Sequence, residues 1–425
     1  MYIDQMGREE LEHWHQIFCE KHKAFRASSL NLDLTRGKPS TRQLDLSNIL
    51  DGATKGSYIT SEGIDSRNYG HLAGLPEMRS LGAELLGVAK NEVIVGGSSS
   101  LSMMYLAMLF AWQFGVSGKG SSWRDQGKVK FLCPVPGYDR HFSICEEFGI
   151  EMIRVSMDKD GPNMDQVEAF IANDKSIKGI WCVPKYSNPT GCIYSQNTIE
   201  RLAKLGKISS PDFRIFYDNA YAVHDLSEDG IDLPKIMDYC REHNTQNNVL
   251  QFTSTSKITF AGSGVSFLAA SEENLNVIQQ HLGVFCIGPD KVNQLRHLNF
   301  IQDRSGLKLH MKKHAKLLQP KFSSVLEHLK NNFEDSDLAQ WTTPKGGYFI
   351  SFDTRPGLAD SVIELAAEAG VKLTPAGATF PYGLDPDNKN IRLAPSFPSL
   401  DDIDRAMRVF CNSVKLASIK QKIGV

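Results

Sequence analysis

The feature that most constrains this chain is the alternation of short apolar runs with helical segments between about residues 90 and 290. Seven of these runs are strand candidates. They are EVIVGG (92–97), VKFLCPV (129–135), EMIRVSM (151–157), GIWCVP (179–184), RIFYDN (214–219), VLQFTS (249–254) and GVSFLAA (264–270). Because strands separated by helices favour parallel pairing, the pattern predicts an α/β fold with a mostly parallel, seven-stranded sheet covered on both faces.

The length of the chain predicts two domains, because 425 residues exceed what one ordinary hydrophobic core holds. Residues 46–290 would form the larger domain. Residues 291–425 begin with a long helical region, broken near Ser305 and Gly306, and would form a smaller α+β domain. The N-terminal segment 1–45, which starts with a helix, would join the smaller domain. We expect the functional site to lie between the two.

Charge and composition exclude several classes of protein. The formal net charge of -2 and the pI of about 6.6 give no basic surplus for nucleic acid. There is no apolar stretch of about 18 residues and no signal-peptide pattern, so we expect no membrane association and a cytoplasmic location. The eight cysteines form no CxxC pair, which predicts neither a metal cluster nor a dense disulfide framework.

Lys257 follows three small hydroxyl residues at the end of a strand run, in FTSTSKITFAGSGVS (252–266). A lysine is usually a solvated surface residue, but this one comes after an apolar strand, where burial is expected. Desolvation lowers the pKa of a lysine and makes the neutral amine nucleophilic toward an aldehyde. The hydroxyls of Ser254 and Ser256 are suited to bind a phosphate beside it.

Two further motifs place polar side chains beyond strand runs. YDNAY (217–221) puts Asp218 at a strand end, where an acid is most often a cap or turn residue. A buried carboxylate there would keep a pyridine nitrogen protonated, and Tyr221 would donate to a phenolate oxygen. VPKYSNPTG (183–191) contains a turn-forming Asn-Pro-Thr-Gly, and the amide of Asn188 would contact the same oxygen or a substrate carboxylate.

Two segments are suited to anions. GGSSSLSMM (96–104) leads into a helix, and the free N–H groups and dipole at a helix start bind phosphate, although serines are equally good N-caps. Arg392, in IRLAPS (391–396), offers a planar fork for a carboxylate, with a structural salt bridge as the rival interpretation.

In this order, the motifs resemble those of fold-type I pyridoxal phosphate enzymes of the class I/II aminotransferase family, from about residue 30 to 400. LTRGKPS, CPVPGYDRHF, STSKITFAG and MKKHAKLLQPKF look closest to a bacterial subgroup described as aspartate aminotransferases, which is related to the aminotransferase-like part of MocR regulators. The resemblance implies the fold of that family, pyridoxal 5'-phosphate as cofactor, and amino acids and 2-oxo acids as small-molecule substrates.

The resemblance also implies roles for single residues. Lys257 would be the Schiff-base lysine and proton shuttle, with Asp218 and Tyr221 as the other catalytic residues. Contacts to the cofactor would come from Ser98, Ser99 and Ser254 at the phosphate, Tyr138 on the ring, His141 behind the aspartate, and Asn188. Gly37, Asn188 and Arg392 would bind the substrate. Tyr69, in RNYGHLAG, corresponds to a tyrosine that reaches the phosphate of a neighbouring subunit, which implies a homodimer with shared active sites.

One position departs from the family pattern. Members commonly carry an arginine eight residues after the lysine, where it contacts the phosphate, and this chain has Val265 there. The change removes a charge-assisted contact. Either another cation replaces it, or the phosphate relies on hydroxyls and helix N–H groups.

The expected reaction moves an amino group between an amino acid, aspartate by resemblance, and 2-oxoglutarate. An aspartate side chain needs a second cation, and Arg36 and Lys291 are the candidates, both otherwise solvated. The alternatives are a broad or alanine/aromatic aminotransferase, a C–S lyase on the same fold, and a non-catalytic sensor. The sensor is disfavoured, because only about 30 residues precede LTRGKPS, too few for a helix-turn-helix domain.

Overall fold

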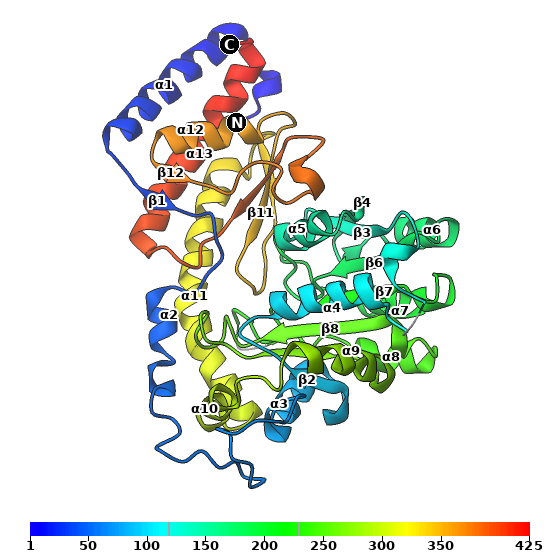
Figure 1. The fold of residues 1–425 in the computed structure, drawn as a ribbon. Coiled ribbons are helices and arrows are strands. Elements are labelled where there is room, and N and C mark those ends of the chain that lie inside the picture. The colour runs from blue at the N-terminus through cyan, green and yellow to red at the C-terminus, as the bar shows by residue number, and fades with distance from the viewer. Residues whose placement is uncertain (118–119, 228–229) are drawn as a thin grey trace.

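The strand candidates form one large sheet in the computed structural model, which describes residues 1–117, 120–227 and 230–425 (Figure 1). Its order is β2(Val93–Val95), β9(Ser266–Ala269), β8(Val249–Ser254), β7(Arg214–Asp218), β6(Ile177–Cys182), β3(Lys130–Val135), β4(Glu151–Asp158) and β5(Gly161–Pro162). The strands β8, β7, β6, β3 and β4 pair in parallel, and β9 is antiparallel to both of its neighbours. The predicted seven-stranded, mostly parallel sheet is confirmed, and the two-residue β5 adds an antiparallel edge.

Successive residues of the central strands face opposite sides of the sheet, and both sides are apolar. On β7, Phe216 packs on one side, whereas Ile215 and Tyr217 pack on the other. This two-sided burial explains why the strands read as continuous apolar runs. One side is covered by α4(Ser100–Phe114), α5(Asp139–Glu147) and α9(Glu272–Phe285), and the other by α6(Met164–Asn173), α7(Gln196–Lys204) and α8(Ile236–Glu242). Beside β2 and β9 lie α3(Pro76–Leu86) and α10(Lys291–Ile301).

A second, smaller layer lies above the large sheet in Figure 1. It contains the antiparallel sheet β10(Ala339–Trp341), β11(Ile350–Thr354) and β13(Asn390–Leu393), together with α12(Ala359–Glu368) and α13(Leu400–Ile423). The helix α1(Arg8–Ala27) packs on α13 through Leu11 and Phe18, and β1(Leu32–Asp33) pairs with β12(Val371–Lys372). The N-terminal segment therefore contributes to the core of this layer. The domain boundaries at 45 and 290 stay a prediction.

The long helical region is broken three residues earlier than we predicted. Gln302, with φ 64°, ends α10, and the side chain of Asp303 caps α11(Arg304–Phe333) by accepting from the N–H of Gly306. Ser305 and Gly306 therefore lie in the first turn of α11. Aspartate is among the preferred N-cap residues, so Asp303 sets the start of α11.

The remaining elements are short. They are α2(Thr41–Asp45), η1(Ile3–Gln5), η2(Asn48–Leu50), η3(Lys90–Glu92), η4(Trp123–Asp125), η5(Leu205–Lys207), η6(Gln246–Asn248) and η7(Pro381–Gly383). Among the described residues, no helix is both long enough and apolar enough to cross a bilayer.

Candidate active site

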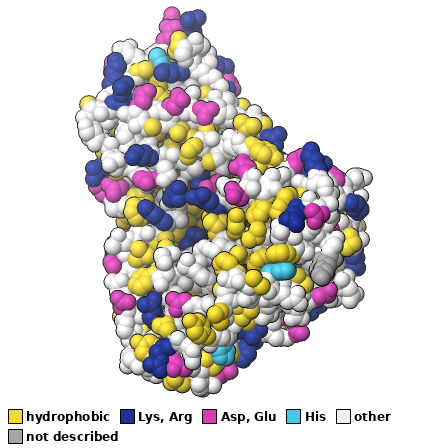
Figure 2. All heavy atoms as spheres, in the orientation of Figure 1, with side chains coloured by type: hydrophobic (Ala, Val, Ile, Leu, Met, Phe, Trp, Pro, Cys, Tyr) yellow, Lys and Arg dark blue, Asp and Glu magenta, His cyan; other side chains and the backbone are white. Residues whose placement is uncertain are grey.

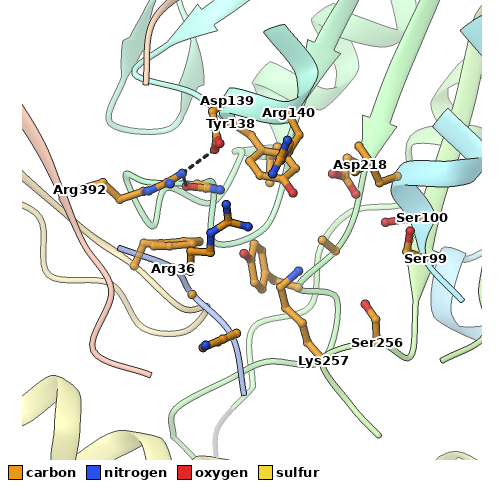
Figure 3. Close-up of a pocket in the computed structure, with 18 of the residues that line it drawn as sticks. Arg36, Ser99, Ser100, Tyr138, Asp139, Arg140, Asp218, Ser256, Lys257 and Arg392 are labelled. Atoms are coloured by element: carbon orange, nitrogen blue, oxygen red, sulfur yellow. Dashed lines mark hydrogen bonds and ion pairs between the residues drawn. The ribbon is translucent and has the colours of Figure 1, made fainter. Parts of the chain in front are cut away.

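A cavity of about 680 Å³ lies where the carboxyl ends of the central strands meet the smaller layer. Ligands of open α/β sheets bind at this edge. Predicted site residues from distant parts of the chain line it together: Gly37, Ser99, Tyr138, Asn188, Asp218, Tyr221, Lys257 and Arg392 (Figure 3). Figure 2 shows Lys and Arg side chains gathered where the two layers meet.

Asp218 ends β7 and lies at the base of the cavity with 2% of its surface exposed. Its Oδ2 is 3.1 Å from Nε2 of His141, whose ring stacks on Trp181 at 4.3 Å between centroids. The other oxygen, Oδ1, is buried and has no hydrogen-bond partner among the described residues. A buried, unsatisfied carboxylate oxygen is costly, and it marks the place of a donor from a ligand.

Lys257 lies in the turn after β8, and its amine points into the cavity (Figure 3). Burial lowers the pKa of this lysine, and the negative charge of Asp218 only partly offsets that effect. The Nζ atom lies 5.1 Å from the centroid of the Tyr221 ring. The amine is thus more readily neutral, as a nucleophile or base requires.

The two tyrosines of the cavity are in their phenol forms. Burial raises the pKa of Tyr221 well above its usual value, and the nearby Tyr138 and Asp218 add to the effect. Burial likewise raises the pKa of Tyr138, which meets the His141 ring edge-on at 4.9 Å. Both hydroxyls are therefore available as hydrogen-bond donors at neutral pH.

Arg392 reaches the cavity from β13, with 6% of its surface exposed. Its Nη1 donates to Asp139 Oδ1 at 2.8 Å and to Asn188 Oδ1 at 3.4 Å. Its guanidinium lies over the ring of Phe349, 4.9 Å from the centroid. A Cβ atom on Gly37 would come within 2.4 Å of that ring, so a glycine is needed at position 37 for this packing.

The predicted phosphate-binding serines divide into two groups. Ser99 caps α4 by accepting from the N–H of Ser102 at 3.4 Å and lines the cavity with Ser100. Ser98 is exposed and Ser254 is buried, and neither is among the lining residues. Ser254 instead pairs with Ser256, which does line the cavity, at 2.8 Å between hydroxyls.

Val265 is buried against Phe267 and Ile258, so its side chain points into the core and away from the cavity. Its main-chain N–H donates to Thr255 Oγ1 at 2.9 Å. A cation that the sequence did not single out lies close to this segment: Arg296 on α10, whose Nη2 donates to Ser263 Oγ at 3.2 Å. Nothing in the sequence pattern distinguishes Arg296 from other helix arginines.

The structure separates Arg36 from Lys291, the two cations that the sequence left equivalent. Arg36 lines the cavity, and no ion pair is recorded for it within the described part of the chain. Lys291 lies elsewhere: its Nζ donates to the carbonyl of Gly70 at 2.9 Å. Lys291 therefore does not line the cavity of its own chain, and it holds a loop in place. Tyr69 is 81% exposed on that loop and does not line the cavity of its own chain.

Among the lining residues that the sequence did not single out, Asp139, Arg140 and Phe349 contact or neighbour the charged groups of the site. Arg140 is exposed and follows Asp139 at the start of α5. PGYDRHF was recognised as a segment, but a pairing over 253 positions, as between Asp139 and Arg392, leaves no local pattern.

Comparison with known proteins decides the family. The chain matches the family model for aspartate amino-transferase over residues 6–425. It belongs to this family. The aspartate aminotransferase of Corynebacterium glutamicum is 44% identical over 417 residues, which cover 98% of this chain and 96% of that protein. A crystal structure of an aspartate transaminase from the same species has a TM-score of 0.96 at 43% identity and covers 99% of both chains.

More distant members of the aminotransferase fold are also similar. LysN, an α-aminoadipate aminotransferase of Thermus thermophilus, has a TM-score of 0.75 at 19% identity, covering 92% of this chain and 93% of that one. That protein was crystallised in complex with N-(5'-phosphopyridoxyl)-L-leucine. The predicted resemblance to fold-type I aminotransferases is confirmed, and the enzyme class is that of the transaminases.

Proposed function

We propose that this aspartate aminotransferase family member binds pyridoxal 5'-phosphate and transfers the amino group of L-aspartate to 2-oxoglutarate. The observation that carries the proposal is the convergence of Lys257, Asp218 and Arg392 on one cavity. These three side chains supply an amine, a buried carboxylate and a fixed cation, which are the groups that such a transfer needs.

The residues present fit the cofactor. Oδ1 of Asp218 is buried without a partner and would accept a hydrogen bond from a protonated ring nitrogen, while His141 holds the other oxygen. The cofactor's aldehyde would be attached to Lys257. The phosphate would lie at the start of α4, near Ser99 and Ser256, where free N–H groups and the helix dipole favour an anion. This arrangement needs no arginine at position 265.

Each of the side chains around the cofactor would then have its own role in the reaction. When bound, the protonated cofactor ring draws electrons from the α-carbon of the substrate. Lys257, with its lowered pKa, removes the α-proton as a neutral amine and returns it as an ammonium. Arg392 and Asn188 hold the α-carboxylate, so that the α-hydrogen faces Lys257.

The position of Arg36 is evidence for a dicarboxylic substrate. Its guanidinium projects into the cavity between Arg392 and Lys257 (Figure 3). A second carboxylate held there would form charge-assisted hydrogen bonds, which are about twice as strong as neutral ones. An alanine side chain would leave this cation unused.

The decisive assay measures turnover with aspartate, alanine and phenylalanine against 2-oxoglutarate. We expect aspartate to give the largest kcat/KM, and Lys257→Ala to abolish turnover. Release of pyruvate and ammonia without any 2-oxo acid would instead indicate a lyase. Activity retained by Lys257→Ala would contradict the proposal.

We also propose a homodimer with shared active sites. Tyr69 is 81% exposed, and its loop lies against residues 287–292. Beside it, Val284, Phe285 and Ile287 are 90%, 66% and 62% exposed. Large apolar side chains gathered in this way mark an interaction surface.

Sedimentation of two variants tests the dimer. Phe285→Glu should yield monomers that bind the cofactor more weakly, because Tyr69 would no longer reach a neighbouring site. Leu384→Glu, at a leucine that is 65% exposed in the smaller layer, should sediment as the unaltered protein does.

A further inference from the structure

In the turn that carries Lys257, two carbonyl groups are held by side chains and not by backbone N–H groups. Lys257 and Ile258 follow β8, and within the described part of the chain no backbone N–H donates to the carbonyl oxygen of either residue. Buried carbonyls need a donor, so the position of this turn depends on the side chains that supply one.

Three buried side chains supply those donors. The carbonyl of Lys257 accepts from His224 Nε2 and from Tyr348 Oη, each at 3.3 Å. The carbonyl of Ile258 accepts from His310 Nε2 at 2.7 Å. The donors come from the turn after β7, from the segment before β11, and from α11. None of them lines the cavity.

A second set of bonds fixes the direction of the contact from Tyr348 to the carbonyl of Lys257. The backbone N–H of Ser40 donates to Gln43 Oε1 at 3.0 Å, so the amide nitrogen of Gln43 faces the other way. That nitrogen donates to Tyr348 Oη at 3.1 Å and to Nδ1 of His314 at 3.3 Å. The Tyr348 hydroxyl therefore has its own hydrogen left for Lys257. His314 Nε2 lies 3.1 Å from Nε2 of His310.

The histidines of this group are neutral at neutral pH. Burial lowers the pKa of His310, and it lowers the pKa of His314 to about 4, with the neighbouring His310 adding to the effect. Burial and the charge of Lys257 hold the pKa of His224 well below its usual value. The turn is thus anchored without placing another cation beside the lysine.

We propose that His224, Tyr348, His310, His314 and Gln43 form a positioning array for Lys257. The array fixes the main chain of the turn, and so places Nζ in the cavity near Asp218. This inference rests on the proposed function, because there Nζ is the atom that bonds the cofactor. The members are positioning residues, since they act through the backbone and touch neither cofactor nor substrate.

Two ligands distinguish an effect on the position of Lys257 from an effect on the rest of the cofactor site. With pyridoxal phosphate, Nζ forms a C=N bond to the aldehyde carbon, and the aldehyde oxygen leaves as water. With 4'-deoxypyridoxine phosphate, which has the same ring and phosphate but no aldehyde, that bond cannot form. The affinity of the full-length chain, freed of cofactor, is measured for both ligands by absorbance and fluorescence.

Tyr348→Phe removes one hydroxyl and little volume. We expect its affinity for pyridoxal phosphate to fall about tenfold, as the loss of one buried hydrogen bond allows, while its affinity for the deoxy ligand stays unchanged. The matched control is Tyr217→Phe, because Tyr217 is equally buried and its hydroxyl has no partner among the described residues. The control should change neither affinity.

A pair of variants at His310 tests the donor itself. His310→Leu should lose affinity for pyridoxal phosphate as Tyr348→Phe does, and His310→Gln, which keeps an N–H donor, should restore most of it. Equal losses for both ligands, or no loss for either, would overturn the array. If the unaltered protein forms no C=N bond and Lys257→Ala changes neither affinity, it is the proposed function that fails.

Discussion

The two ends of the cavity are built in opposite ways. At the sheet end, Asp218 is 2% exposed, is bonded to His141, and is backed by the stacked Trp181. At the other end, Arg36 is exposed on the loop after β1, and no ion pair is recorded for it among the described residues. One end is closed and held in place before any ligand arrives, whereas the other is open.

The difference follows from the cost of burying charge. A buried carboxylate needs fixed partners, because an unpaired charge in the interior destabilises the fold strongly. A solvated guanidinium can remain unpaired at little cost. We infer that the sheet end serves the reaction common to all substrates, and that the open end serves the choice among them.

The largest effect is expected from removing the charge at the closed end. Asp218→Asn keeps the size of the side chain but no longer stabilises a protonated ring nitrogen, so kcat should fall on the order of a hundred- to a thousandfold. Steady-state assays at saturating cofactor measure this. His141→Gln keeps an N–H donor for Asp218 and should lose far less. A loss of only a few fold in Asp218→Asn would show that this end is not the reactive one.

The array behind Lys257 should be sensitive to acid. The pKa of His314 is lowered to about 4 in the folded chain, against about 6.5 in the unfolded one. Between these values only the unfolded chain binds the proton, so the free energy of unfolding falls as the pH falls, by up to about 3 kcal/mol from this residue. Denaturant titrations from pH 7 to 4 should show the slope, and His314→Gln should flatten it. His13→Gln, at an exposed histidine of α1, should leave the slope as it is.

The open end should affect substrate choice and little else. Arg36→Gln should raise the KM for aspartate about ten- to thirtyfold, the worth of a charged hydrogen bond, and leave kcat/KM for alanine nearly unchanged. Lys38→Gln is the matched control, because Lys38 also lines the cavity but lies over the ring of Phe397, 3.9 Å from its centroid. Equal effects of Arg36→Gln on the reactions of aspartate and alanine would show that Arg36 does not determine substrate preference.

The smallest effect is expected where the two ends meet. Asp139 holds Nη1 of Arg392 at 2.8 Å, and its own side chain is 34% exposed. Asp139→Asn should free the guanidinium for a substrate carboxylate and lower the KM for aspartate by up to about fivefold, the scale of a partly exposed ion pair. A rise in KM would mean that Asp139 orients Arg392 and does not compete for it.

Much of the fold was predictable, because buried parallel strands are apolar on both faces and therefore stand out as continuous runs. The convergence of Lys257, Asp218 and Asn188 was expected for a related reason, since residues after parallel strands meet at one edge of the sheet. The two-residue β5 has no such pattern, and the start of α11 depended on the cap at Asp303.

The remaining site residues depend on contacts that the sequence does not encode locally. Arg36 and Lys291 looked alike until the carbonyl of Gly70 was found to hold Lys291. His314 was part of a recognised segment, MKKHAKLLQPKF, but helical spacing does not reveal which distant turn a buried face will meet. Ser98 and Tyr69 are exposed in a single chain, so their predicted roles at the phosphate stay predictions.

The helix α11 has a consequence for how the molecule comes apart. It is about 45 Å long; Leu307 and Met311 pack beside β9, and Phe322 and Val325 pack in the core of the smaller layer. A chain cut before α10 would lose Leu307 and Met311 from the core beside β9. The turn of Lys257 would also lose its donor from His310. Unfolding of either layer should therefore destabilise the other, and fragments made at residue 290 should need each other to fold.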